Sequence, residues 1–68
     1  MQLTLFTDYA LRTLVYLALQ PEKQLSTITE VADRFTISRN HVVKIVHQLG
    51  MKGYIETIRG KHGGIRLA

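Results

Sequence analysis

Two helix-start signals lie eleven residues apart in the middle of the chain, and they leave room for only one short helix between them. The first, Thr27-Ile28-Thr29-Glu30, has the form of a capping box, in which threonine and glutamate side chains each accept the other residue's backbone N–H. The second is Ser38, a preferred N-cap residue directly before another helical pattern. The spacing predicts a helix over about 28–35, a turn at 36–37 and a helix over about 39–50. This is the order of a helix-turn-helix.

Both predicted helices carry their apolar residues on one side. In the first, apolar residues recur at i, i+3, i+4 and i+7, the spacing of a single helical face. They are Ile28, Val31, Ala32 and Phe35. In the second, four apolar residues fall on an arc about 100° wide. They are Val42, Ile45, Val46 and Leu49. These two faces form the predicted core.

A further helix is expected before this pair, over about 7–19. Thr7 is the expected N-cap, and Asp8 would favour the positive end of the helix dipole. The segment is apolar on nearly every side, so part of its surface must meet something outside these 68 residues. Pro21 ends the helix, and a short polar connection runs from Pro21 to Ser26.

The chain after the second predicted helix indicates a β-hairpin over about 54–67. Tyr54 to Arg59 is β-prone, residues 60–64 form a glycine-rich turn, and residues 65–67 return. The fold class is therefore mainly α with a small β-hairpin. The whole of residues 1–68 is expected to form one winged helix-turn-helix domain.

The composition narrows the class of protein. An apolar share of 46% excludes intrinsic disorder. Sixty-eight residues form one domain at most, and no nucleophile–base pair or carboxylate dyad is visible, so we expect no enzyme. No segment approaches the roughly 20 apolar residues of a membrane span, and the start lacks the basic region of a signal peptide. We expect a cytoplasmic protein that does not bind membranes.

Metal binding by these residues is not expected. The chain has no cysteine, which removes disulfides and thiolate ligands. The spacings of His41, His47 and His62 match no usual zinc pattern.

The formal net charge of +4 is unevenly distributed along the chain. Residues 1–37 carry three basic and four acidic groups, a net charge of −1. Residues 38–68 carry six basic groups and one acidic group, a net charge of +5. A neutral half joined to a basic half suggests that the second half binds a polyanion.

The outer arc of the 39–50 helix carries the side chains that read a major groove. They are Arg39, Asn40, Val43, Lys44 and His47. Arginine suits guanine, asparagine adenine, valine a thymine methyl group and lysine a phosphate. The N-terminal end of a recognition helix points at the bases, where Ser38, Arg39 and Asn40 lie. Taken alone, this arc fits an ordinary solvent face equally well. The absence of any carboxylate from Ser38 to Gly53 favours DNA, because exposed helices usually mix signs.

The hairpin turn is a second candidate DNA contact. Its charged and imidazole residues are Arg59, Lys61, His62 and Arg66. Glycine lets a backbone approach phosphate, and arginine suits the negative potential of the minor groove. The alternative is a glycine turn with incidental charge. A nucleotide-binding loop is not indicated, because no helix start follows Gly60-x-x-Gly63.

Three stretches in order carry a family resemblance. They are Met1-Gln2-Leu3-Thr4-x-Phe6-Thr7-Asp8-Tyr9-Ala10-Leu11-Arg12, Ser38-Arg39-Asn40-His41-x-Val43-Lys44-Ile45-x-x-Gln48-Leu49 and Arg59-Gly60-Lys61-x-Gly63-Gly64-Ile65-Arg66-Leu67. Over essentially the whole chain, this combination resembles the nitric-oxide-sensitive repressors of the bacterial iron–sulfur regulator family. The resemblance implies a homodimer that binds a palindromic, AT-rich operator. By position it implies that Arg39, Asn40, Lys44 and His47 lie in the major groove, and Arg59 with Lys61 on the wing.

The resemblance also implies how such a repressor is controlled. Repressors of this group repress nitric-oxide detoxification genes until nitric oxide attacks their [2Fe–2S] or [4Fe–4S] cluster. Their three cluster cysteines and dimerisation helix follow the second wing strand, so we expect both beyond Ala68 in a longer parent protein. Asp8 matches an acidic residue that completes the cluster in some relatives, although a role at the helix start explains it equally well.

Two other interpretations stay open at this point. One is a sister regulator that senses iron–sulfur supply or cysteine status. The other is a winged helix that binds protein or RNA.

Overall fold

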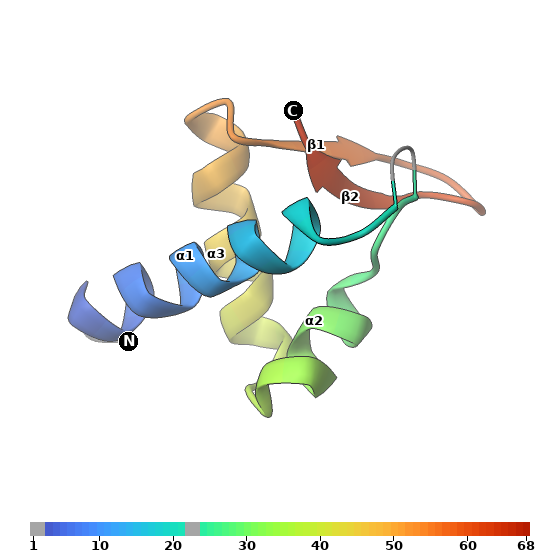
Figure 1. The fold of residues 1–68 in the computed structure, drawn as a ribbon. Coiled ribbons are helices and arrows are strands. Elements are labelled where there is room, and N and C mark those ends of the chain that lie inside the picture. The colour runs from blue at the N-terminus through green and yellow to red at the C-terminus, as the bar shows by residue number, and fades with distance from the viewer. Residues whose placement is uncertain (1–2, 22–23) are drawn as a thin grey trace.

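The helices and strands follow the predicted order. The computed structural model describes residues 3–21 and 24–68. Its elements are α1 (Leu3–Ala18), α2 (Ile28–Phe35), α3 (Arg39–Met51), β1 (Ile55–Ile58) and β2 (Gly64–Leu67). In Figure 1, α1 crosses α3, α2 lies beside the start of α3, and the hairpin follows the end of α3. The predicted winged helix-turn-helix is confirmed.

The helix-turn-helix is held by the caps that the sequence predicts. The Glu30 backbone N–H donates to Thr27 Oγ1 at 3.1 Å, and the Thr27 backbone N–H donates to Glu30 Oε2 at 3.3 Å. Ser38 Oγ accepts the backbone N–H of His41 at 3.2 Å. These bonds satisfy donors that a helix start leaves free, so they fix where α2 and α3 begin.

The predicted start of the first helix at Thr7 is wrong. Helix α1 begins at Leu3, so Thr7 and Asp8 lie in its second turn and no acidic residue occupies its first turn. The upstream residues contain no proline or glycine to stop a helix, and helical geometry there lets Phe6 pack against the core. A threonine marks a helix start only where the chain before it leaves the helix.

The hairpin is antiparallel and pairs Ile55 with Leu67 and Ile58 with Gly64. The sequence predicted only a polar connection from Pro21 to Ser26, but Ser26 forms an antiparallel bridge with Ile65. Because an extended residue can pair with the free edge of β2, the connection adds a third backbone segment, one residue long, beside the two-stranded sheet.

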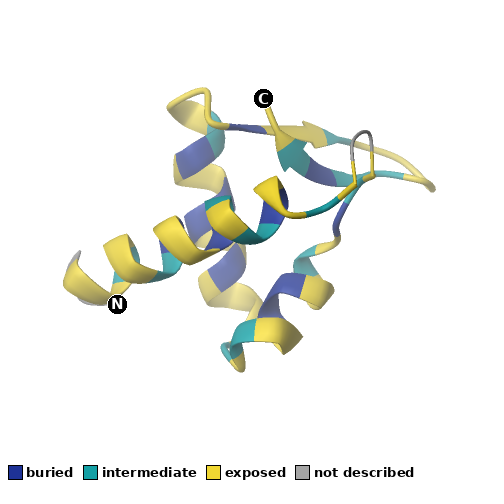
Figure 2. Ribbon diagram, viewed as in Figure 1, coloured by how far each residue is buried: buried dark blue, intermediate teal, exposed yellow. Residues whose placement is uncertain are grey.

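The core lies where the three helices and the hairpin meet, shown as dark blue in Figure 2. All four apolar residues predicted for the inner arc of α3 are buried, as are Val31 and Ala32 of α2. The remaining buried apolar residues are Ala10, Leu17, Ile55 and Ile65. This burial fixes the rotation of α3 and therefore which of its residues face outward.

Candidate nucleic-acid interface

The residues of α3 that were predicted to contact DNA lie on its outer arc and face solvent. Val42 and Ile45 are fully buried, which turns the opposite side of the helix outward. The residues predicted to read DNA on and before this helix are all exposed. They are Ser38, Arg39, Asn40, Val43, Lys44 and His47. The short apolar side chain of Val43 stands among polar ones with half of its surface exposed, as a thymine-methyl contact requires.

The charged side chains of α3 are all basic. No acidic side chain lies in its first turn, so the positive end of the helix dipole is not neutralised there. Arg39 and Lys44 add full charges to the outer arc. Such a surface attracts a polyanion and has no carboxylate to repel one.

A hollow of about 430 Å³ beside this arc adds two residues, Phe6 and Gln48, that the sequence did not indicate as DNA contacts. It is lined by Phe6, Val43, Lys44, His47 and Gln48. Phe6 packs against the core and also lines the hollow. Gln48 could have been found from its place one turn after Lys44. Nothing in the sequence indicated that the start of α1 reaches this side of α3.

The wing turn carries Arg59, Lys61 and His62, all of them exposed. Gly60 has a φ of 111°, a conformation that favours glycine, and its C=O accepts the Gly63 N–H at 3.0 Å. A Cβ on Gly63 would collide with the Ile58 carbonyl oxygen. The glycines are therefore required by the tight turn itself, whereas the sequence suggested that they let the backbone approach phosphate.

Arg66 differs from the other predicted wing residues because it has an acidic partner. It lies directly opposite Glu56 across the hairpin, and its Nε and one terminal nitrogen are each 3.2 Å from Glu56 Oε2. Glu56 is the only carboxylate in residues 38–68. The pair is partly exposed, and it offsets the charge of Arg66.

Asp8, the candidate cluster ligand, also has a basic partner. Its Oδ1 accepts the Arg12 Nε–H at 3.1 Å, and both side chains are about half exposed. Among residues 3–21 and 24–68, no three histidine, cysteine or acidic side chains gather in a group that could hold a metal ion. His41, His47 and His62 thus lie on the surface as separate groups.

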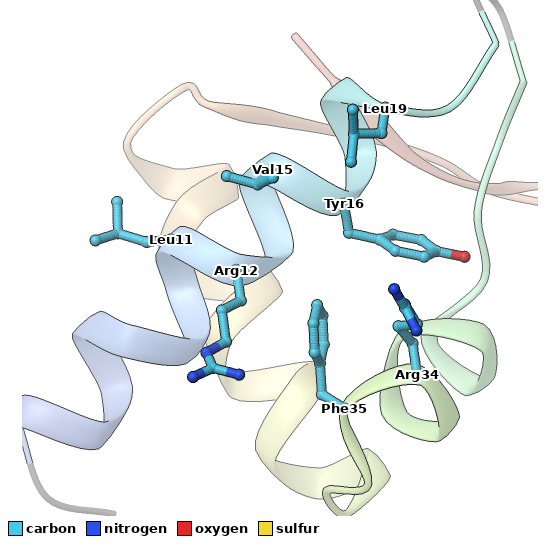
Figure 3. A pocket seen from close by; sticks show the side chains of 7 residues that line it. All are labelled: Leu11, Arg12, Val15, Tyr16, Leu19, Arg34 and Phe35. Carbon is cyan, nitrogen blue, oxygen red and sulfur yellow. The ribbon is translucent and has the colours of Figure 1, made fainter.

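An apolar groove of about 270 Å³ lies between α1 and α2, and none of its lining residues belongs to the outer arc (Figure 3). One side has Leu11 and Val15 of α1 and Leu19 just after the helix, which are 59%, 58% and 77% exposed. Phe35 and Tyr16 meet edge to face at 6.1 Å, and Arg12 and Arg34 flank them. The prediction that the first helix is apolar beyond its buried side is confirmed.

No helix in the described part of the chain has the length and apolar character needed to cross a membrane.

Comparison with known proteins assigns this chain to a family. The family model of Rrf2, described as an iron-dependent transcriptional regulator, matches residues 3–68. The HTH-type transcriptional regulator NsrR of Shouchella clausii (strain KSM-K16) is 60% identical over 68 residues, which are 100% of this chain and 46% of that protein. The chain thus spans about half the length of this relative.

Two solved structures share the fold. CymR, the global cysteine regulator of B. subtilis, superposes with a TM-score of 0.88 at 22% identity, covering 98% of this chain and 52% of that one. A putative transcriptional regulator from Listeria innocua gives a TM-score of 0.88 at 25% identity, covering 98% and 46%. These relatives are regulators and not enzymes, in agreement with the sequence analysis. This chain belongs to the Rrf2 family of transcriptional regulators.

Proposed function

We propose that this chain is the operator-binding domain of a repressor that controls nitric-oxide stress genes. The observation that carries the proposal is the exposed, carboxylate-free outer arc of α3 on a domain 60% identical to an NsrR regulator. The proposed response to nitric oxide rests on the similarity to NsrR. The proposed DNA contacts rest on the residues of α3 and of the wing hairpin.

In this proposal α3 lies in the major groove with its first turn toward the bases. Arg39 pairs with guanine and Asn40 with adenine, while Val43 contacts a thymine methyl group. Ser38 and Lys44 bond to phosphates, and His47 extends the contact along the helix. All six side chains are exposed, so none needs to leave the core.

The wing turn binds the adjacent minor groove and its phosphates. Arg59 enters the groove, where the negative potential is strongest over AT-rich sequence. Lys61 and His62 contact the backbone. Arg66 contributes less than the others, because Glu56 already offsets its charge.

The regulator acts as a homodimer on a palindromic, AT-rich operator. The half-sites of such an operator lie about 34–36 Å apart, which exceeds the longest extent of the backbone of this domain, 31 Å. One copy therefore reads one half-site. The exposed apolar groove of α1 is the surface that we assign to the dimer, since such patches mark interfaces.

An iron–sulfur cluster, [2Fe–2S] or [4Fe–4S], does not fit the residues of this chain alone. The chain supplies no thiolate, and its candidate carboxylate, Asp8, is held by Arg12. We propose that the cluster ligands belong to other parts of the parent protein, with Asp8 at most an additional ligand. The parent protein is proposed to be cytoplasmic.

A binding titration tests the proposed DNA contact. Labelled probes would be an AT-rich palindromic duplex, a shuffled duplex of equal composition and a hairpin RNA. We expect the palindromic duplex to bind most tightly, with an affinity that falls at a log–log slope of roughly −0.9 per neutralised phosphate as salt rises. Tighter binding to the RNA, or a flat salt response, would overturn the proposal.

A second titration tests the nitric-oxide input, with the parent protein and this chain side by side. Nitric oxide should release the parent protein from its operator and leave binding by this cysteine-free chain unchanged. If iron or cysteine supply released the parent and nitric oxide did not, the sister-regulator interpretation would be correct.

A further inference from the structure

Strand β2 is paired on both of its edges at the base of the wing. One edge meets β1, and on the other the Ser26 N–H donates to the Ile65 C=O at 2.9 Å. The Ile65 N–H donates in return to the Ser26 C=O at 2.7 Å. Ser26 and Ile65 are both buried, so water does not compete for these bonds.

Gly64 is what allows the two backbones to approach. A Cβ at this position would lie 2.6 Å from the Ser26 carbonyl oxygen and 3.0 Å from Leu25 Cβ. Neither neighbour is the end of a flexible side chain, so the backbone itself would have to move. Gly63 meets only the hairpin's own residues. The two adjacent glycines therefore have different roles.

The bridge joins the wing to the helix-turn-helix. Ser26 directly precedes Thr27, the N-cap of α2, and Gly64 lies three residues after Lys61 of the wing turn. An isolated two-stranded hairpin is only marginally stable and twists strongly. Pairing with Ser26 adds a third backbone segment beside the hairpin and fixes the direction of the hairpin relative to the helices.

We propose that the Ser26–Ile65 bridge sets the direction of the wing relative to α3, and that Gly64 is a positioning residue for DNA binding. Gly64 acts through the bridge and needs no contact with DNA. The inference rests on the proposed wing contact of Lys61, and its first test is independent of that contact.

The first test measures the wing directly, without DNA. The chain has no cysteine, so nitroxide labels can be placed at Lys61→Cys on the wing and Gln48→Cys on α3, both exposed positions. We expect one narrow interlabel distance, which Gly64→Ala shifts or broadens. Ser26→Ala should leave the distance unchanged, because it keeps the backbone bridge and removes a buried hydroxyl that has no partner among the described residues. An unchanged distance in folded Gly64→Ala would overturn the proposal.

If Gly64→Ala does not fold, Ser26→Pro provides the same test from the other side of the bridge. Proline lacks the N–H that donates to Ile65, and the substitution leaves the hairpin sequence intact. We expect the same shifted or broadened distance, and an unchanged one would equally overturn the proposal.

The second test asks whether wing direction matters for DNA binding. On the AT-rich half-site, the factor by which Lys61→Ala weakens binding should fall to about 1 in the Gly64→Ala background. The factor by which Arg39→Ala weakens binding should be the same in the Gly64→Ala background as in the wild type. If Gly64→Ala merely destabilised the whole domain, this factor would change as well. An unchanged Lys61 factor would contradict the positioning role, whereas a wild-type Lys61 factor of 1 would contradict the proposed wing contact instead.

Discussion

Arg39 and Asn40 carry the prediction of base recognition at the scale of single residues. Either substitution by alanine should weaken operator binding by about 1–3 kcal/mol and relax base preference, because a bidentate contact to one base is lost. Lys61→Ala is the control, and it should weaken operator and shuffled DNA alike. Competition titrations measure both effects. Unchanged operator affinity in Arg39→Ala would mean that α3 does not read the bases.

Glu56 is predicted to limit non-specific DNA binding. Glu56→Gln removes the only carboxylate of residues 38–68 and frees Arg66, so affinity for shuffled DNA should rise. The salt slope should steepen by about 0.9 if Arg66 then neutralises a phosphate. Asp8→Asn is a matched control, because it frees Arg12 from a similar pair on α1 with the same change of net charge. Equal gains in both variants would indicate net charge alone.

The sequence identified exposed residues more readily than their partners. The helical period alone placed Arg39, Asn40 and Lys44 outward, since burial of one face determines the other. The Glu56–Arg66 pair depends on the hairpin register, which the residue types of these strands did not determine. The close approach behind Gly64 depends on a segment that lies almost forty residues earlier, which local pattern cannot reveal.

Among the elements, the turn between α2 and α3 contains a strained residue. Thr36 has a φ of 55°, unfavourable for a β-branched side chain, where its N–H donates to the Asp33 C=O at 3.4 Å. The Ile37 N–H donates to the Ala32 C=O at 3.1 Å, completing the bond pattern of a Schellman motif. Glycine is the usual residue at such a position.

Thr36→Gly should therefore stabilise the domain. Relief of left-handed strain, about 1–2 kcal/mol, exceeds the entropic cost of glycine, about 0.4–1 kcal/mol. Thermal unfolding should show Tm raised by several degrees, at about 4–8 °C per kcal/mol for a domain of this size. Thr29→Gly, inside α2, should instead lower Tm, because glycine is unfavourable within a helix. A lower Tm in both variants would show that Thr36 is not strained.

Helix limits were predictable where a capping side chain had a partner to identify it. Thr27 with Glu30, and Ser38 before an amphipathic run, predicted the starts of α2 and α3. The start of α1 lacked such a signal, and helical geometry before Thr7 lets Phe6 pack against the core. The Ser26 bridge was missed because a single extended residue has no periodicity.

At the scale of the whole molecule, the proposed dimer predicts how this chain binds an operator. Because the groove of α1 that we assign to the dimer is small, about 270 Å³, the 68-residue chain should be monomeric or weakly associating and bind a full operator little better than a half-site. Physical linkage of two such domains raises avidity by roughly 10²–10⁴. Sedimentation and paired titrations measure this, with the parent protein as control. A tight dimer with strong full-site preference would show that these residues suffice for dimerisation.

Methylation interference on a half-site duplex tests the central claim most directly, because one reagent modifies both grooves. Dimethyl sulfate methylates guanine N7 in the major groove and adenine N3 in the minor groove. If α3 reads the major groove and the wing the minor groove, guanine methylation should block binding within the half-site and adenine methylation beside it. Arg39→Ala should abolish a guanine signal and leave the adenine signal in place. Binding that is insensitive to guanine methylation at every position, or sensitive only in the minor groove, would contradict the account.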